Sequence, residues 1–250
     1  MPSAVSPPVL SARDHAVIEL VGKLRQVTAR QIAAVLFADN ASKTPLDRTL
    51  KRLVEQRYLM RLGRLVGGDG GGAQQYSYQL GRKGWRLLDK EAAYWQPRAV
   101  NLHTRAIADC FVQLVIAERA GEFALLSYEP EPDCHVQLGR IRLTPDAYIE
   151  LGFRQYRRQV SSYLEVDRAT EHRATIQDKC VRYWKAYQSW ELPVFPYIVF
   201  VVPDDKRKAE VENVVAGGPQ EAQELFTVCT FGCFPQALSE VTKTGVESIG

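Results

Sequence analysis

Two carboxylates stand one residue apart at the end of an apolar run in YLEVDRATEHRATIQDK, residues 163–179. They are Glu165 and Asp167, and a third carboxylate, Asp146, lies upstream in PDAYIEL. Mg²⁺ is a hard cation that binds carboxylate oxygens and activates water for attack on a phosphodiester. Carboxylates near basic side chains also form ordinary ion pairs. The segment therefore indicates a metal-dependent nuclease site, the remnant of one, or a salt-bridged corner of an ordinary domain.

Alternating helices and strands must position these carboxylates. Strands that alternate with helices predict an α/β domain with a mixed sheet. We place this domain at residues 103–235, after a linker at 97–102 and before a tail at 236–250. The predicted elements are a helix from His103 to about Gly121, the strands FALLSYE, RIRLTPDAYIELGF and SSYLEVD, the helix ATIQDKCVRYWKAYQSW, the strand PYIVFVV, the helix DKRKAEVENVV and the strand LFTVCTF.

This order of elements, with PDAYIEL on one strand and YLEVD on the next, resembles the PD-(D/E)xK restriction-endonuclease-like fold. The resemblance implies that Asp146 and Glu165 hold Mg²⁺, and that Glu118 corresponds to an extra carboxylate of some members. The family expects lysine two residues after the glutamate, where this chain has Asp167. The missing lysine puts nuclease activity in question.

Three interpretations of this departure stay open. Lys179 from the following helix could reach into the site, or Asp167 could serve as an added metal ligand. Alternatively, Arg168 and Arg173 could pair with Glu165 and Asp167 and leave a purely structural cluster. The candidate catalytic residues are Asp146, Glu165, Asp167 and Lys179, of which the first three are the candidate Mg²⁺ ligands.

The N-terminal third differs from the remainder in charge. Residues 1–96 hold 15 Lys and Arg against 8 Asp and Glu, a net charge of +7. The remaining residues hold 17 against 21, a net charge of −4. A basic segment joined to a mildly acidic one is typical of a nucleic-acid-binding module fused to a different domain.

Three helices, two strands and a further helix, RKGWRLLDKEAAYW, are predicted in that order within residues 1–96. Ser11 with Asp14, and Thr28 with Gln31, form capping boxes that begin the first two helices. Thr44 is the predicted cap of the third helix, with Pro45 at its first position. The strands YLMRLGRLV and QQYSYQL flank the Gly-rich stretch GGDGGGA, so the order is that of a winged helix-turn-helix. The predicted DNA contacts are Lys43, Thr44, Arg48, Lys51, Arg52, Arg61 and Arg64.

The combination of this basic module with LTPDAYIEL, YLEVDRATE and KCVRYWKAY resembles the replication-relaxation family of plasmids and other mobile elements. The likeness runs from about residue 11 to 235, and the family pattern DR(G/A)TE is met by residues 167–171. It implies a DNA-binding protein of plasmid replication or conjugative transfer. The expected partners are double-stranded DNA, relaxosome or replication proteins, and a second copy of the chain.

Composition narrows the classes of protein to which the chain could belong. No apolar run reaches the roughly 20 residues needed to span a bilayer, and the N-terminus lacks the regions of a signal peptide, so the expected location is the cytoplasm. Five cysteines without a CxxC pair argue against a disulfide framework.

We therefore favour an α/β (α+β) DNA-binding protein whose nuclease-like domain is degenerate. The alternatives are an active Mg²⁺-dependent endonuclease and a protein-binding module.

Overall fold

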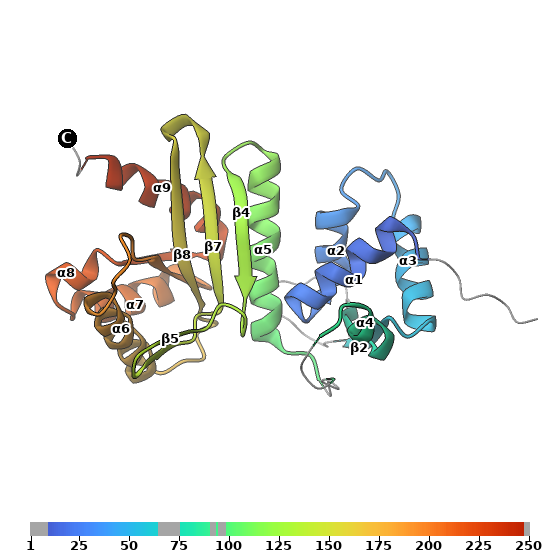
Figure 1. The fold of residues 1–250 in the computed structure, drawn as a ribbon, viewed down its shortest axis with the longest axis horizontal. Helices are drawn as coiled ribbons and strands as arrows, with labels where there is room; N and C mark the ends of the chain where they lie inside the picture. Colours follow the sequence, from blue (N-terminus) through green and yellow to red (C-terminus); the bar gives the residue numbers. More distant parts are fainter. Residues whose placement is uncertain (1–9, 65–75, 91–93, 95–98, 248–250) are drawn as a thin grey trace, which may run out of the picture. The chain divides into compact units, whose positions relative to one another are not determined.

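The computed structural model describes residues 10–64, 76–90, 94 and 99–247, and it divides into two compact units (Figure 1). The units are Met1–Ala108 and Asp109–Gly250. Their boundary falls inside helix α5 (Leu102–Arg119), later than the linker expected at 97–102. The first turn of α5 is joined to α2 of the first unit, because Gln31 Nε2 donates a hydrogen bond to the carbonyl oxygen of Arg105 at 3.1 Å. The predicted mixture of helices and sheets, α+β, is confirmed.

The first unit combines helices with a three-stranded antiparallel sheet. The strand order is β1-β3-β2, in which β3 pairs with both neighbours. The two predicted hairpin strands are thus present, and a short third strand, which the sequence did not indicate, joins them. The Gly-rich stretch between β2 and β3 lies outside the described residues. The elements are α1 (Ala12–Leu24), β1 (Val27–Thr28), α2 (Ala29–Leu36), α3 (Thr44–Glu55), β2 (Leu59–Arg64), β3 (Tyr76–Leu80) and α4 (Arg82–Leu87).

Side-chain caps begin the first two helices as predicted. The capping boxes of Ser11 with Asp14 and of Thr28 with Gln31 are both formed. The third helix begins differently, because Lys43 occupies the N-cap position with a helical backbone and Thr44 is the first helical residue. The prediction of Thr44 as the cap was therefore wrong.

The second unit is built on a five-stranded mixed sheet with the order β10-β9-β8-β7-β4. β4, β7 and β8 are antiparallel, whereas β8, β9 and β10 are parallel. The expected tail is largely helical, because α9 occupies most of it. The elements after α5 are β4 (Ala124–Pro130), β5 (Val136–Leu138), β6 (Ile141–Leu143), β7 (Ala147–Phe153), η1 (Arg154–Tyr156), β8 (Arg158–Val166), α6 (Arg173–Gln188), β9 (Tyr197–Val202), α7 (Asp205–Ala216), α8 (Gln220–Gln223), β10 (Phe226–Thr230), η2 (Phe231–Cys233) and α9 (Phe234–Glu247).

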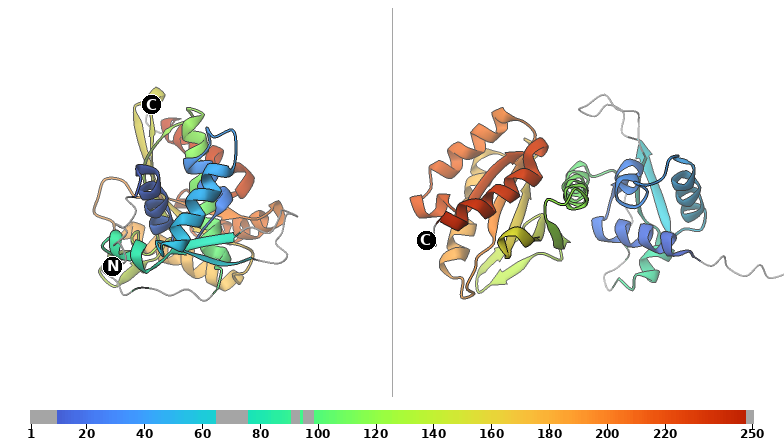
Figure 2. Two further views of the ribbon diagram at one scale, coloured as in Figure 1. Left: turned by 90° about the vertical axis from the view of Figure 1, so that its right-hand side faces the viewer. Right: turned by 90° about the horizontal axis from the view of Figure 1, so that it is seen from above.

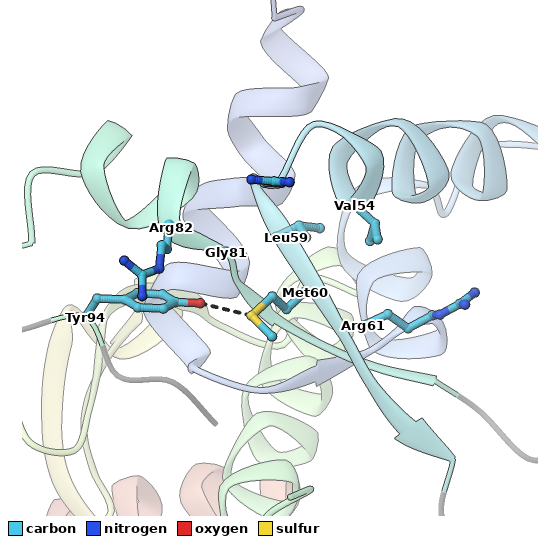
Figure 3. A pocket seen from close by; sticks show the side chains of 8 residues that line it. Val54, Leu59, Met60, Arg61, Gly81, Arg82 and Tyr94 are labelled. Carbon is cyan, nitrogen blue, oxygen red and sulfur yellow. Dashed lines mark hydrogen bonds between the residues drawn. The ribbon is translucent and has the colours of Figure 1, made fainter. Parts of the chain in front are cut away.

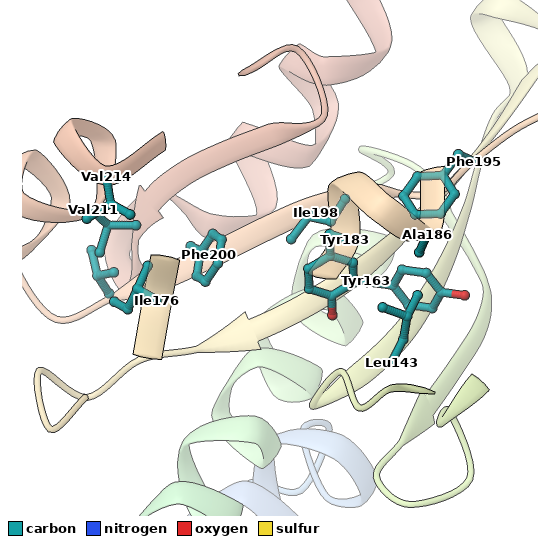
Figure 4. Packing of buried hydrophobic residues seen from close by; sticks show 11 residues of the cluster. Leu143, Tyr163, Ile176, Tyr183, Ala186, Phe195, Ile198, Phe200, Val211 and Val214 are labelled. Atoms are coloured by element: carbon teal, nitrogen blue, oxygen red, sulfur yellow. The ribbon is translucent and has the colours of Figure 1, made fainter. Parts of the chain in front are cut away.

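The two faces of this sheet pack against different helices. Tyr163, Ile198 and Phe200 share a core cluster with Ile176 and Tyr183 of α6, together with residues of α7 (Figure 4). The opposite face contacts α5, which is drawn in green and lies nearly end-on in the right-hand view of Figure 2. The α5–sheet contact includes the rings of Phe111 and Tyr128, whose centroids are 4.9 Å apart. The sheet is therefore covered on both faces, as a largely apolar sheet requires.

Two general features bear on function. All five cysteines are free thiols. Across the part of the chain that the structure describes, no helix combines the length and the apolar character needed to cross a membrane.

Candidate functional site

The three candidate carboxylates are brought together by strand register. Tyr148 of β7 pairs with Tyr163 of β8, and side chains two residues apart on a strand point to the same face. Asp146, Glu165 and Asp167 therefore fall on the face that α6 and α7 cover. All three are buried, with Glu165 and Asp167 each only 2% exposed. An ionised carboxylate at such a position needs a cation or several hydrogen bonds to offset lost hydration.

Glu165 receives its partners from α6. Lys179 Nζ lies 2.8 Å from Glu165 Oε2, and the Tyr183 hydroxyl donates a hydrogen bond to Oε1 at 2.5 Å. Lys179 also lies 2.8 Å from Glu171 Oε1, so one ammonium serves two carboxylates. Burial raises the pKa of Glu165 to about 7, although Lys179 and Tyr183 act in the opposite direction. Burial opposes the charge of Lys179, but the two carboxylates prevail and raise its pKa, so the ammonium stays charged.

Asp167 receives a different cation, Arg207 of α7. Arg207 Nε lies 2.5 Å from Asp167 Oδ2, and a second guanidinium nitrogen donates to the carbonyl oxygen of Glu171 at 2.7 Å. The same guanidinium pairs with Glu210 at 2.9 Å. Arg207 thus ties the loop after β8 to the start of α7. Burial acts against its charge, but Asp167 and Glu210 prevail and raise its pKa.

The carboxylate oxygens of Asp146, Glu165 and Asp167, as arranged here, do not fit the ligand set of a Mg²⁺ ion. Both Glu165 oxygens are engaged, and Asp146 Oδ2 accepts a hydrogen bond from the backbone N–H of Val166 at 2.6 Å. Asp167 Oδ1 and Glu171 Oε2 are buried and have no hydrogen-bond partner among the described residues, but the other oxygen of each carboxylate pairs with Arg207 or Lys179. Nowhere in residues 10–64, 76–90, 94 and 99–247 do three His, Cys, Asp or Glu side chains gather as a metal ion would need.

The other acidic and basic candidates lie elsewhere. Glu118 Oε1 accepts a hydrogen bond from the backbone N–H of Leu125 at 2.8 Å, so it fixes the turn between α5 and β4. Within the described residues, Arg168 and Arg173 do not supply the cations of the cluster, because Lys179 and Arg207 do so. The idea of a salt-bridged corner therefore agrees with this geometry, but with different basic partners.

Sequence reasoning missed Tyr183 and Arg207. Tyr183 was not among the candidate site residues, but it lies one turn beyond Lys179 and shares its face. Arg207 is 40 residues from Asp167 in the chain and becomes its neighbour because β8 and β9 are parallel. The backbone N–H of Asp167 donates to the carbonyl oxygen of Val201, two residues before the Pro203 that precedes α7. The Asp167–Arg207 contact could have been found from the pairing of β8 with β9. If these strands are parallel neighbours, the helix after β9 must start beside the end of β8.

The basic face predicted on α3 is present in the first unit. Lys43, Arg48 and Lys51 are all exposed. Lys51 Nζ lies 3.9 Å from Glu55 Oε1, and both side chains remain largely exposed, so this pair is weak. Within the described part of the chain, no carboxylate pairs with Arg48. A groove of about 490 Å³ runs between α3 and the strands, and its lining includes Lys51 and Arg61 as well as the acidic Asp47 and Glu55.

Arg52 differs from the other basic residues of α3. Its guanidinium forms an ion pair with Asp14, whose side chain is 3% exposed. Burial favours the neutral acid, but hydrogen bonds from Ser11 and Arg52 prevail and lower the pKa of Asp14. Asp14 also completes the capping box of α1. Arg52 therefore connects α3 to the start of α1, and its structural role competes with the predicted DNA contact.

The strand β2 contributes further positive charge. The Arg61 guanidinium lies 4.3 Å from the centroid of the Tyr76 ring. Arg64 ends the strand, and its side chain is outside the described part of the structure. A pocket of about 440 Å³ beside β2 is lined by Arg57, Arg61 and Arg82, and the Tyr94 hydroxyl closes one side by donating to Met60 Sδ at 3.0 Å (Figure 3).

Comparison with known proteins places the chain in a family. A search among curated proteins returned no match. Residues 18–194 match the replication-relaxation family, and this range covers more than half of the 250 residues. The match includes α2, α3, β2 and β3 of the first unit, and in the second unit β7 and β8 with Asp146, Glu165 and Asp167. The chain therefore belongs to the replication-relaxation family.

Proposed function

We propose that this chain is a non-catalytic protein that binds double-stranded DNA through its first unit. In this proposal the first unit works as a winged helix-turn-helix, with α3 in the major groove and the β2–β3 hairpin along the DNA backbone. The family match supports a role in the replication or relaxation of plasmids or other mobile elements. The chain would act in the cytoplasm, beside relaxosome or replication proteins.

The observation that carries the proposal is the exposed basic face of α3 beside β2. Arg48 and Lys51 are exposed on α3, and Lys51 shares a groove with Arg61. The order of α1, β1, α2, α3, β2 and β3, with an antiparallel three-stranded sheet, supports the winged-helix assignment. Basic side chains on one exposed helix attract the phosphate backbone and give binding that weakens with salt.

We further propose that the nuclease-like second unit is a folded scaffold. Lys179 and Arg207 hold the carboxylates that an active relative would use for Mg²⁺. A divalent ion would have to displace a lysine that serves two carboxylates, and it would have to remove the proton that Glu165 retains up to about pH 7. We propose that this unit serves assembly, including pairing with a second copy of the chain.

Replacing Arg48 and Lys51 together with alanine should weaken binding to duplex DNA. Each lost phosphate contact lowers the slope of log K against log salt by about 0.9, so the slope should fall by about two. Arg52 is left intact in this test because its loss would break the contact with Asp14. Fluorescence anisotropy of a labelled duplex over a series of salt concentrations gives both quantities.

The matched control replaces Arg86 and Lys90, which lie in and after α4 of the same unit. This variant removes two positive charges without touching α3 or β2. It should bind like the wild-type protein, apart from a small uniform effect of net charge. If the two double variants bind equally well, α3 is not the DNA-contacting surface.

A further inference from the structure

The β7–β8 hairpin extends beyond its neighbours in the sheet. Strand β9 begins its pairing at Tyr197, opposite Ser162, so β8 has no β9 partner before that residue. On the other side, β4 pairs with β7 only as far as Gly152. The start of β8 is therefore unpaired on its β9 side, whereas on the β4 side only Phe153 and the closing turn lie beyond the last strand pair, at the top of Figure 1. The closing turn of the hairpin is thus the part that is free to contact another molecule.

The tip of this hairpin is strongly basic. Residues 151–160, LGFRQYRRQV, contain three arginines and no acidic residue. Arg154 and Arg157 are exposed, Arg158 is half-buried, and Tyr156 is 38% exposed. In the part of the chain that the structure describes, none of the three arginines pairs with a carboxylate. An isolated group of unpaired arginines is a binding surface for a polyanion such as the phosphate backbone.

The tip also has a defined shape. A single turn of 3-10 helix at Arg154–Tyr156 closes the hairpin, and Arg157 follows with the left-handed backbone angles φ 49° and ψ 39°. Phe153 at the base of the tip packs edge-on against Phe123, with ring centroids 5.9 Å apart. Arginines presented from a closed turn lose less conformational freedom on binding than arginines of a long loop.

The tip lies at the opposite end of β7 and β8 from the carboxylates. Asp146 precedes β7 and Glu165 is near the end of β8, whereas Arg154 and Arg157 lie between the two strands. Seven residues of extended strand span about 23 Å at roughly 3.3 Å per residue. DNA held at the tip would therefore not lie over the Glu165–Lys179 cluster.

We propose that the tip of the β7–β8 hairpin is a second duplex-DNA-binding surface, in which Arg154, Arg157 and Arg158 contact backbone phosphates and Tyr156 packs against the sugar edge of the groove. This proposal rests on the proposed function, duplex-DNA binding by the first unit, and adds a DNA contact made by the second unit. It explains why a domain with neutralised carboxylates keeps an exposed, unpaired arginine cluster.

The test changes all three arginines to glutamine in the full chain, which keeps a polar side chain at each position and removes the charge. Affinity for a labelled duplex should fall roughly tenfold at physiological salt, and the salt slope should fall by about two to three. The matched control changes Arg182, Lys185 and Lys206 to glutamine, which removes three exposed charges from the same unit. The control should bind within about twofold of wild type, because it leaves the proposed phosphate contacts in place.

A position-specific measurement accompanies the binding series. A photo-crosslinking amino acid in place of Tyr156 should form a covalent adduct with the duplex on irradiation, whereas the same amino acid in place of exposed Gln188 on α6 should not. The proposed tip contact is overturned if the glutamine variant binds like its control, and equally if position 156 gives no adduct.

Comparison with the Arg48 and Lys51 variant separates the two proposals. Loss of binding in the α3 variant alone overturns the hairpin contact and leaves the winged-helix proposal standing. Loss in the hairpin variant alone supports the hairpin contact and overturns α3 as the binding surface. Loss in both supports two surfaces, and a wild-type protein that binds no duplex overturns both.

Discussion

Replacing Lys179 with methionine should lower the free energy of unfolding by about 3–5 kcal/mol at pH 8, the usual cost of removing one partner of a buried ion pair. Lys179 Nζ is 2.8 Å from both Glu165 and Glu171, and the Glu165 side chain is only 3% exposed. Without the ammonium, Glu165 must either stay charged in an apolar surrounding or take up a proton. Urea-induced unfolding followed by circular dichroism measures the loss.

Two further variants test whether the broken ion pair causes the loss of stability in Lys179→Met. Lys185→Met removes an exposed lysine from the same helix and should change stability by no more than about 0.5 kcal/mol. Adding Glu165→Gln to Lys179→Met removes the stranded carboxylate and should recover a large part of the loss. A Lys179→Met protein as stable as Lys185→Met would show that the buried pair does not form.

The stability of the wild-type protein should fall as pH rises from about 4.5 to 7. Burial raises the pKa of Glu165 to about 7, so the folded chain holds a proton that the unfolded chain releases near pH 4.5. Where the folded state binds more protons, unfolding becomes easier with increasing pH. A difference of roughly two to three units between the pKa of Glu165 in the folded and unfolded states corresponds to about 3–4 kcal/mol of stability. This contribution is fully lost above about pH 7.

The Glu165→Gln variant isolates this contribution. It cannot titrate, so its stability relative to wild type should improve steadily across that pH range and level off above it. The cost of Lys179→Met should likewise shrink towards about pH 5, where Glu165 is protonated. A stability difference between wild type and Glu165→Gln that stays constant across the same pH range would contradict the raised pKa.

Local signals in the sequence predicted much of the fold. The capping boxes of Ser11 and Thr28 depend on residues three positions apart, so the sequence contains everything needed to place them. The sequence likewise placed YLEVD on a predicted strand, and Glu165 does lie near the end of β8. Strand β1 escaped notice because two residues carry no periodicity, and helix α9 was taken for a tail although it continues to Glu247.

The partners of the charged residues were harder to predict. Periodicity places Arg52 on the exposed side of α3, but its long side chain reaches Asp14, 38 residues earlier. Arg207 reaches Asp167 only because parallel strands bring the start of α7 beside the end of β8. For Lys179 the sequence left several interpretations open, and in the structure its ammonium is a partner of both Glu165 and Glu171. Sequence patterns thus located the acidic residues, while long-range register determined which cations neutralise them.

The most direct test of DNA binding without cleavage uses supercoiled plasmid on one gel. The wild-type protein is incubated with plasmid in Mg²⁺, Mn²⁺ or EDTA, beside Asp146→Asn and Glu165→Gln variants. We expect a salt-sensitive mobility shift that is the same in all three buffers, with the plasmid still supercoiled after the protein is removed. Nicked circles that form with Mg²⁺ or Mn²⁺, and that disappear with EDTA and in both variants, would instead show that the buried carboxylates catalyse DNA cleavage.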